Sequence, residues 1–218
     1  MKQLKKLKTG DGSFTFVSEE FGETYHSVSG AEEEAIKKYA EPTNIVELAK
    51  KGTVRILDFC FGIGYNSAAA IDAALAVNPD CKIRIVGLEL DESLSEKLKE
   101  LSPKFKSYEI IKNIKNNNYK NENIHISLVF GDAKQTIQDI SEEFDICFFD
   151  AFSPKTQPDM WSEEVFKDVC AKLKVGGLLA TYSCATHVRI NLVRAGFDVK
   201  DGPCIGRRAP STIATKLF

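Results

Sequence analysis

From residue 53 onward, apolar runs rich in β-branched residues alternate with polar segments of helical character. The apolar runs occupy residues 54–59, 83–90, 124–130, 144–149 and 178–182. The helical segments occupy residues 66–77, 92–101, 134–140, 162–173 and 186–195. Strands that are apolar along their length, each followed by a helix, are typical of a parallel sheet covered on both faces. The pattern therefore predicts a doubly wound α/β fold.

The last two apolar runs, at residues 197–200 and 212–217, follow each other without a helix between them. Two strands joined that directly pair antiparallel, because a parallel return needs a crossover connection. The sequence thus predicts a seven-stranded sheet of five parallel strands and a terminal antiparallel hairpin. This is the layout of the Rossmann-like class I methyltransferases that depend on S-adenosylmethionine (SAM).

The first 52 residues differ in character from the rest. Glycines interrupt residues 1–30, which indicates short strands or a hairpin. Residues 31–51 have helical composition with a break at Pro42, which predicts two short helices. We expect residues 1–52 to cover the site and residues 53–218 to form the methyltransferase core, within one structural domain. The segment 111–123, rich in Asn and Lys, is expected to be a solvated connection.

Composition and charge exclude several classes of protein. With 218 residues, 43% of them hydrophobic, and a net charge of −2, the chain fits one globular domain without overall basic character. No apolar run approaches the roughly 20 residues of a membrane span, and the lysine-rich start lacks the apolar stretch of a signal peptide. The six cysteines form neither a CxxC pair nor a Cys/His cluster. We expect a cytoplasmic protein with reduced thiols, no membrane contact and no metal.

A glycine-containing turn follows the first strand of the core. Its candidate cofactor-binding residues are Asp58, Phe61, Gly62, Gly64 and Asn66. In a doubly wound sheet, ligands bind outside the carboxyl ends of the strands, and glycines in the first turn let a cofactor approach the backbone. An isolated GxG turn can also serve packing alone, but its place after the first core strand favours a cofactor site.

The second core strand ends at Glu89, about 25 residues beyond the glycine turn, the separation at which an acid binds the ribose hydroxyls of a nucleotide cofactor. NAD and SAM both satisfy this rule. The dinucleotide fingerprint GxGxxG needs a third glycine, however, and position 67 is serine. The pattern therefore favours SAM.

Two further acids stand at predicted strand ends, Asp132 and Asp150. In class I methyltransferases an acid at the position of Asp132 commonly binds the adenine amino group, with a backbone contact from the next residue, here Ala133. A helix N-cap is the alternative explanation of Asp132. Asp150 opens a loop with two prolines at the edge that faces the cofactor. We expect its carboxylate near the reacting end of the ligand.

Four segments resemble the methyltransferase domain of the MnmC family, whose members methylate the 5-aminomethyl group of the wobble uridine in tRNA. They read FCFGIGYNS, FFDAFSPKTQPDMWS, LLATYSCATHVRINLVRAGFDV and GRRAPS. The run DAFSPKTQPDMW is the most specific of them. Together with residues 21–30, the resemblance spans nearly the whole chain.

The resemblance implies SAM as methyl donor and the tRNA anticodon loop as partner, with 5-aminomethyl-2-thiouridine as acceptor and 5-methylaminomethyl-2-thiouridine as product. Bifunctional bacterial members carry a second, FAD-dependent oxidase domain, for which this chain has no room. We expect a stand-alone methyltransferase, with a separate protein as a source of the aminomethyl uridine. The family has glycine at the position of Cys60 and threonine at that of Ile63, differences that should affect affinity rather than reaction type.

Methyl transfer to an amine requires alignment of the nitrogen lone pair with the methyl carbon, and the nitrogen must first lose a proton. Asp150 is the candidate catalytic residue. We expect it to accept a hydrogen bond from the substrate amine, or from the ammonium group of SAM, and so to fix the line of attack.

Aromatic and basic side chains are candidates for substrate binding. Tyr25, Phe152 and Trp161 can stack on the uracil ring, although core packing explains each of them equally well. Arg207 and Arg208 lie in the turn between the last two strands, which emerges at the carboxyl edge. They suit phosphate or carboxylate recognition, with a merely solvated turn as the alternative.

Two other functions remain open. Aminopropyl transfer to a polyamine uses the same type of fold, but its aspartate-rich loop is absent here apart from Asp150 and Asp159. The second is a non-catalytic nucleotide-binding partner in an RNA-modification complex, against which the acids at three strand ends argue. Incubation with labelled SAM and either tRNA or putrescine separates these functions.

Overall fold

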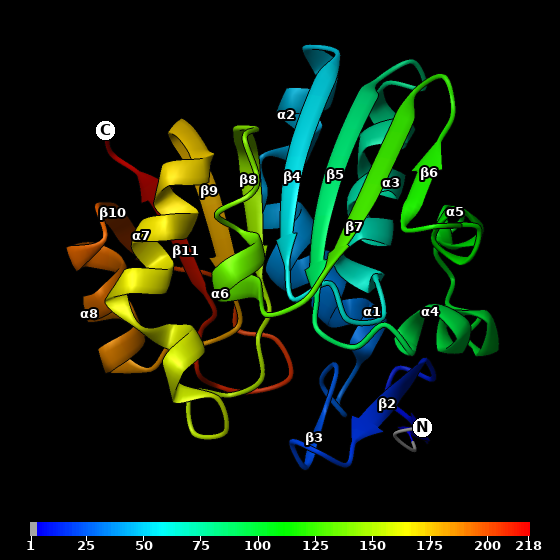
Figure 1. Ribbon diagram of the computed structural model, residues 1–218, viewed down its shortest axis with the longest axis horizontal. Helices are drawn as coiled ribbons and strands as arrows, with labels where there is room; N and C mark the ends of the chain where they lie inside the picture. The colour runs from blue at the N-terminus through cyan, green and yellow to red at the C-terminus, as the bar shows by residue number, and fades with distance from the viewer. Residues whose placement is uncertain (1–3) are drawn as a thin grey trace.

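The core of the protein is an eight-stranded sheet in the order β10-β11-β9-β8-β4-β5-β7-β6 (Figure 1). The computed structural model describes residues 4–218. The strands of this sheet are β4 (Thr53–Phe59), β5 (Lys82–Glu89), β6 (Asn118–Lys120), β7 (Ile124–Phe130), β8 (Phe144–Phe149), β9 (Leu173–Thr181), β10 (Phe197–Asp201) and β11 (Thr212–Lys216). β4, β5, β7, β8 and β9 are parallel, and β11 pairs antiparallel with β9 and β10. The predicted doubly wound fold with a terminal antiparallel hairpin is confirmed.

The sheet has one strand more than the seven that the sequence predicts. The extra strand, β6, lies within the segment 111–123 and pairs antiparallel with β7 at the edge of the sheet. Asn116 and Asn117 reverse the chain before it, with φ of 49° and 62°, a left-handed region that asparagine adopts more readily than most residues. An edge strand of polar residues carries no hydrophobic pattern, so the pattern of apolar positions does not predict it.

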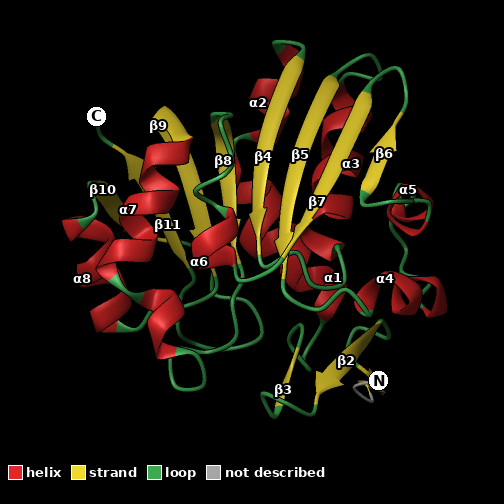
Figure 2. Cartoon of the chain, viewed as in Figure 1, coloured by secondary structure: helices red, strands yellow, loops and turns green. Residues whose placement is uncertain are grey.

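Helices cover both faces of the main sheet (Figure 2). α6 (Ala133–Thr136), α7 (Glu163–Lys172) and α8 (Thr186–Arg194) lie on one face, and α2 (Ile45–Lys50) and α3 (Tyr65–Val77) on the other. Successive residues of β4 point to opposite faces: Ile56 joins the core on the α3 side, whereas Leu57 joins the core on the α7 side. Burial on both faces explains why the core strands read as continuous apolar runs.

Shorter helical elements complete the fold. They are α1 (Ala31–Glu34), α4 (Leu94–Lys97) and α5 (Tyr108–Lys112), the π-helical turn η1 (Ala35–Ala40), and the 3₁₀ turns η2 (Glu41–Thr43), η3 (Leu98–Glu100) and η4 (Pro158–Trp161). The helix predicted over 134–140 ends at Thr136, because the amides of residues 138–140 bond to carbonyls three residues back and tighten the chain. The helix predicted over 92–101 is likewise split between α4 and η3.

The N-terminal strands form a separate antiparallel sheet at the carboxyl edge of the main sheet (Figure 1). Its strands are β1 (Leu4–Lys8), β2 (Phe14–Ser18) and β3 (Glu23–Thr24). Phe16 from this small sheet and Tyr39 from η1 belong to the same buried cluster as Ile56 of the main sheet. Asp11 ties the two parts together, since its Oδ2 accepts hydrogen bonds from the amides of Glu32 and Glu33, both at 3.1 Å.

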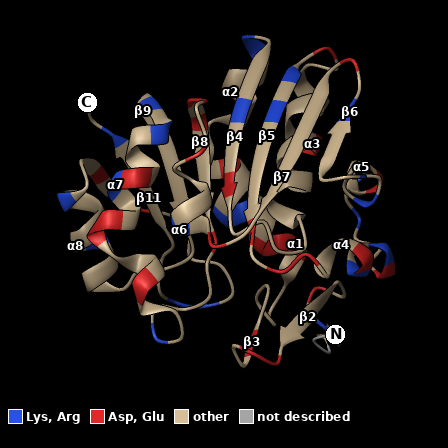
Figure 3. Ribbon diagram, viewed as in Figure 1, with Lys and Arg blue, Asp and Glu red and all other residues tan. Residues whose placement is uncertain are grey.

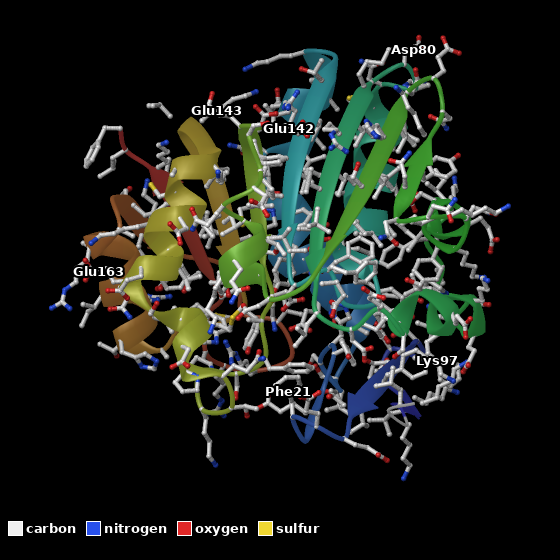
Figure 4. The ribbon with its side chains drawn as sticks, in the orientation of Figure 1. Phe21, Asp80, Lys97, Glu142, Glu143 and Glu163 are labelled. Atoms are coloured by element: carbon white, nitrogen blue, oxygen red, sulfur yellow. The ribbon has the colours of Figure 1, made fainter. Side chains whose placement is uncertain are left out.

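Charge is distributed unevenly between the two edges of the main sheet. Figure 3 shows basic residues at the amino-terminal ends of β4 and β5 and acidic residues toward the carboxyl ends of the central strands. Figure 4 places Phe21 at the carboxyl edge, and Asp80 and Glu142 at the opposite edge.

Within residues 4–218, no helix is long and apolar enough to cross a membrane. The same residues contain no group of three or more His, Cys, Asp or Glu arranged to hold a metal ion.

Candidate active site

Two cavities open at the carboxyl edge of the sheet and meet there. The first has a volume of about 330 Å³ and extends from the glycine turn to η4, and the second, of about 450 Å³, lies between the small N-terminal sheet and the turn before β11. Four residues line both cavities: Tyr25, His26, Asp150 and Phe152. A ligand in one cavity can therefore meet a ligand in the other at these side chains.

The glycine turn forms one wall of the first cavity. Cys60, Gly62 and Gly64 have positive φ of 69°, 56° and 73°, and the Phe61 amide donates to the Leu88 carbonyl at 2.8 Å. Phe61 and Gly62 line the cavity. Gly64 does not: a Cβ there would lie 2.8 Å from the Phe61 ring, so this glycine allows close packing at the start of α3.

Glu89 ends β5 and faces the first cavity. Its Oε2 accepts a hydrogen bond from the Gly62 amide at 2.8 Å, and its Oε1 accepts from the amides of Leu90 and Asp91 at 2.8 and 2.9 Å. Burial raises the pKa of the Glu89 carboxyl, although these three amides oppose the rise. The carboxylate thus holds the glycine turn against the end of β5 and presents its oxygens to the cavity.

Asp132 and Ala133 line the first cavity beside Glu89. Asp132 is also the N-cap of α6, because its Oδ1 accepts a hydrogen bond from the Lys134 amide at 3.0 Å. The N-cap explanation of Asp132 therefore holds, and it is compatible with a place on the cavity wall. Its side chain is 37% exposed, so its second oxygen can accept a hydrogen bond from a ligand.

Asp150 follows β8 and is held from two sides. Tyr39 donates its hydroxyl to Oδ1 at 2.5 Å, and Asn66 donates its amide to Oδ2 at 2.8 Å. Burial raises the pKa of the Asp150 carboxyl, while the nearby His26 and the two hydrogen bonds lower it. The carboxylate therefore stands in a fixed orientation at the junction of the two cavities.

A buried set of charged side chains lies behind Asp150. Nδ1 of His26 is 3.7 Å from Asp150 Oδ2 and 3.8 Å from Glu34 Oε2. Glu34 in turn accepts hydrogen bonds from Lys38 Nζ at 2.7 Å and from the Ser27 amide at 2.8 Å. Burial alone would raise the pKa of Glu34, but His26 and Lys38 lower it to about 2.

The chemistry of the first cavity fits SAM. Phe61, Leu88 and Met160 give it apolar walls, and the carboxyls of Glu89 and Asp150 stand at its polar positions. Such a surface suits an adenosine with two ribose hydroxyls and a cationic end.

Comparison with known proteins identifies the family. A model of the S-adenosyl-L-methionine-dependent methyltransferases matches residues 92–217, more than half of the chain. The crystal structure of MnmC2 from Aquifex aeolicus superposes with a TM-score of 0.89 at 31% identity, covering 98% of this chain and 70% of that one. The chain belongs to the MnmC family of SAM-dependent methyltransferases. SAM is the cofactor of this family.

Curated relatives of this methyltransferase are longer than the chain. An uncharacterized protein of Methanocaldococcus jannaschii is 33% identical over 99% of this chain, which spans 62% of that protein. The tRNA 5-methylaminomethyl-2-thiouridine biosynthesis bifunctional protein MnmC of Leptospira interrogans is 25% identical over 96% of this chain, which spans 35% of it. Spermidine synthase from Thermotoga maritima, with a TM-score of 0.59 and 12% identity, shares the fold.

Two residues of the glycine-turn motif lie behind the cavity of this methyltransferase instead of lining it. Asp58 is fully buried on the face of β4 that α3 covers, and it accepts a hydrogen bond from the Ser67 hydroxyl at 2.6 Å. Its alternation with Leu57 and Phe59 places it on the opposite face of β4 from these two residues. Asn66 is also buried, and it reaches the site only through its hydrogen bond to Asp150.

Trp161 offers no stacking surface to a substrate. It is 1% exposed, lies edge-on to Phe149 with ring centroids 5.1 Å apart, and donates its indole N–H to the Phe152 carbonyl at 2.8 Å. It anchors the loop that carries Phe152. Phe152 itself stacks on Phe21 at 4.7 Å and packs edge-on against Tyr25 at 5.2 Å.

The two arginines of the last turn have different surroundings. Arg207 lines the second cavity and donates to the carbonyl of Tyr182, which holds it against the site. Arg208 is exposed and lines neither cavity. Only the first of the pair is therefore placed to contact a bound substrate directly.

Sequence reasoning missed several residues that shape this site: Phe21, His26, Glu34, Lys38 and Tyr39. Their partners lie far away along the chain, as the separation of 111 positions between Tyr39 and Asp150 illustrates. The spacing of Glu34 and Lys38, four residues apart in a helical segment, indicates an ion pair. It does not show that the pair is buried.

Proposed function

We propose that this methyltransferase acts on tRNA and methylates the aminomethyl nitrogen of wobble 5-aminomethyl-2-thiouridine, giving 5-methylaminomethyl-2-thiouridine. The observation that carries the proposal is the meeting of two cavities at Asp150, because a transferase must bring donor and acceptor together at one point. The names of the MnmC relatives support this choice of acceptor. The anticodon loop of tRNA is then the partner, and the cytoplasm is the site of action.

In this proposal the first cavity binds the donor. Glu89 binds the ribose hydroxyls, and Asp132 and the backbone of Ala133 bind the adenine. Phe61 and Gly62 contact the adenosine from the glycine turn. All five residues line this cavity, and each side chain supplies the polar or apolar group that its part of the ligand needs.

The second cavity binds the aminomethyl uridine. Tyr25 and Phe152, at the junction, provide aromatic surface for the uracil ring, since single-stranded bases are commonly recognised by stacking. Arg207, at the far side of the cavity, contacts a phosphate or a polar group of the nucleotide. Arg208 is exposed and lies outside both cavities, so we assign it no contact with the uridine itself.

Bound SAM would supply a methyl group on a sulfonium sulfur, which would leave as a neutral thioether when the amine lone pair attacks the methyl carbon in line. The protein aligns the amine and excludes water. Asp150 accepts a hydrogen bond from the amine and directs its lone pair toward the first cavity. Because Tyr39 and Asn66 each donate to one oxygen of Asp150, the carboxylate cannot rotate away from this line.

The test is methyl transfer by the purified protein. It is incubated with SAM and tRNA that carries the aminomethyl uridine, and the nucleosides are analysed by mass spectrometry. We expect a gain of one methyl group on that nucleoside. A parallel reaction with decarboxylated SAM and putrescine should give no spermidine, and the reverse pattern would establish aminopropyl transfer instead.

Replacement of Asp150 tests the role of the carboxylate. Asp150→Ala should lower the rate at least about 100-fold, the usual contribution of a positioned acid or base, while the protein stays folded. Asp139→Ala, at an exposed position outside both cavities, is the matched control and should keep the full rate. Full turnover by Asp150→Ala would refute the role.

The separate protein expected to supply the aminomethyl uridine stays a prediction.

A further inference from the structure

His26 is fixed at the junction of the two cavities with one ring nitrogen unpaired. The residue is 5% exposed, and within residues 4–218 its Nδ1 is one of only a few buried side-chain atoms with no hydrogen-bond partner. Its ring stacks on Tyr65 with centroids 5.4 Å apart, and its amide donates to the Thr15 hydroxyl at 3.1 Å. These contacts hold Nδ1 between the carboxyls of Glu34 and Asp150.

Apart from His26, the side chains within the described residues that contact Asp150 carry no positive charge. Glu34 is balanced by Lys38, at 2.7 Å. The two donors to Asp150, Tyr39 and Asn66, are neutral. The other titratable or charged groups that line the second cavity with His26 are Tyr25, Glu23, Tyr182 and Arg207. Arg207 donates to a backbone carbonyl, so His26 is the titratable group placed to balance Asp150.

The protonated form of His26 is favoured in this setting. Burial by itself lowers the pKa of the imidazole, but the carboxylates of Glu34 and Asp150 raise it further than burial lowers it. An alkyl ammonium that enters the second cavity and approaches Asp150 therefore meets a second positive charge on the same carboxylate. Two cations on one carboxylate disfavour each other, so each lowers the pKa of the other, and the ammonium deprotonates at a lower pH than it would without the imidazolium.

We propose that His26 is a positioning residue that acts through Asp150 and drives the acceptor amine into its neutral form. This inference rests on the proposed function. The imidazolium of His26 pairs with the carboxylate of Asp150. The substrate ammonium then releases one proton to solvent. The nitrogen lone pair then forms the bond to the methyl carbon, and the carbon–sulfur bond breaks with its electron pair remaining on sulfur. Without the imidazolium, Asp150 would instead hold the amine as an unreactive ammonium.

The pH dependence of methyl transfer tests the inference. In His26→Gln the acidic limb of the rate profile should move up by about one pH unit or more, and the rate should recover at high pH, where the amine is neutral without help. The KM for SAM should stay unchanged. The control is His187→Gln, at an exposed position outside both cavities, which should keep the wild-type profile. An equal loss of rate at every pH, or no change, would overturn the inference.

A second measurement does not depend on turnover or on the variant's folding. The chain has three histidines, whose imidazole signals can be followed by NMR in wild-type protein labelled at histidine. Addition of S-adenosylhomocysteine and 5-aminomethyluridine should lower the titration midpoint of the His26 signal, and an unchanged midpoint would contradict the proposal. If the wild type methylates no tRNA, the proposed function fails and this inference fails with it; methylation by the wild type with an unchanged His26 midpoint would refute the inference alone.

Discussion

Glu34 and Lys38 form a buried ion pair, and an exposed pair of the same spacing, Lys37 and Glu41, lies beside it. Both pairs have an N–O distance of 2.7 Å. The side chains of the first pair are 5% and 8% exposed, and those of the second are 44% and 53% exposed. Glu34→Gln and Glu41→Gln are thus the same chemical change at two levels of burial. We predict that the first lowers the free energy of unfolding far more than the second.

The structure gives the magnitude for Glu34→Gln. The environment of Glu34 lowers its pKa from 4.5 to about 2, which corresponds to roughly 3 kcal/mol of stabilisation at neutral pH. Removal of one partner from a buried ion pair typically costs about 3–5 kcal/mol, because the other charge stays buried and unpaired. A glutamine at this position has only one acceptor oxygen for Lys38 and the Ser27 amide. We therefore expect a loss of about 3 kcal/mol or more.

The assay is urea unfolding followed by the fluorescence of Trp161, which is buried. Glu41→Gln is the control and should cost less than about 0.5 kcal/mol. Because the pKa of Glu34 is depressed in the folded state, its contribution is present above pH 4.5 and is lost as the pH falls through about 2. The difference in free energy of unfolding between wild type and Glu34→Gln should therefore shrink as the pH falls from 4.5 to about 2. Equal costs for the two variants, or a cost that does not change with pH, would refute the reasoning.

Three further predictions concern the glycine turn. Glu89→Gln should weaken SAM binding by about 10-fold or more in calorimetry, because an amide cannot accept the Gly62 hydrogen bond and those of the next two amides together; tight binding would contradict the role of Glu89. Asp58→Asn should stabilise the fold at neutral pH, because burial raises the pKa of this carboxyl well above its ordinary value, so its stability contribution is lost as pH rises; thermal melting at pH 5 and pH 8 should show a larger gain at pH 8. Cys60→Gly should be more stable than Cys60→Ala by about 1 kcal/mol in urea unfolding, because φ is 69° there; an equal stability would argue against backbone strain.

Parallel-sheet geometry explains why the sequence could predict the location of the site. The carboxyl ends of parallel strands meet at one edge, so Glu89, Asp132 and Asp150 had to approach one another once the strands were recognised. The glycine turn was predictable for the same reason. Asp58, which was expected to bind the cofactor, lies behind the cavity, because a position near a strand end does not show to which face of the sheet the side chain points. Its alternation with two apolar neighbours was the available signal.

Other features depend on contacts between distant parts of the chain. The sequence left stacking on a substrate and core packing equally open for Trp161, and the neighbouring aromatic rings that enclose it decide for packing. Strand β6 forms because β7 offers an unpaired edge, not because its own residues favour a strand. The spacing of Lys38 from Glu34 indicates an ion pair but not its burial, and Lys38 is only 4% exposed.

The sequence by itself determined the succession of the parallel core strands and their helices, the glycine turn and the acids at the strand ends, because these follow from local hydrophobic pattern and chain direction. Only the tertiary structure decided how Asp150 is held and what surrounds it. Tyr39 and His26 come from the N-terminal segment, while Asp150 lies more than 100 residues later. Their protonation depends on burial and on each other's charge, and both arise only when the N-terminal segment packs against the sheet edge.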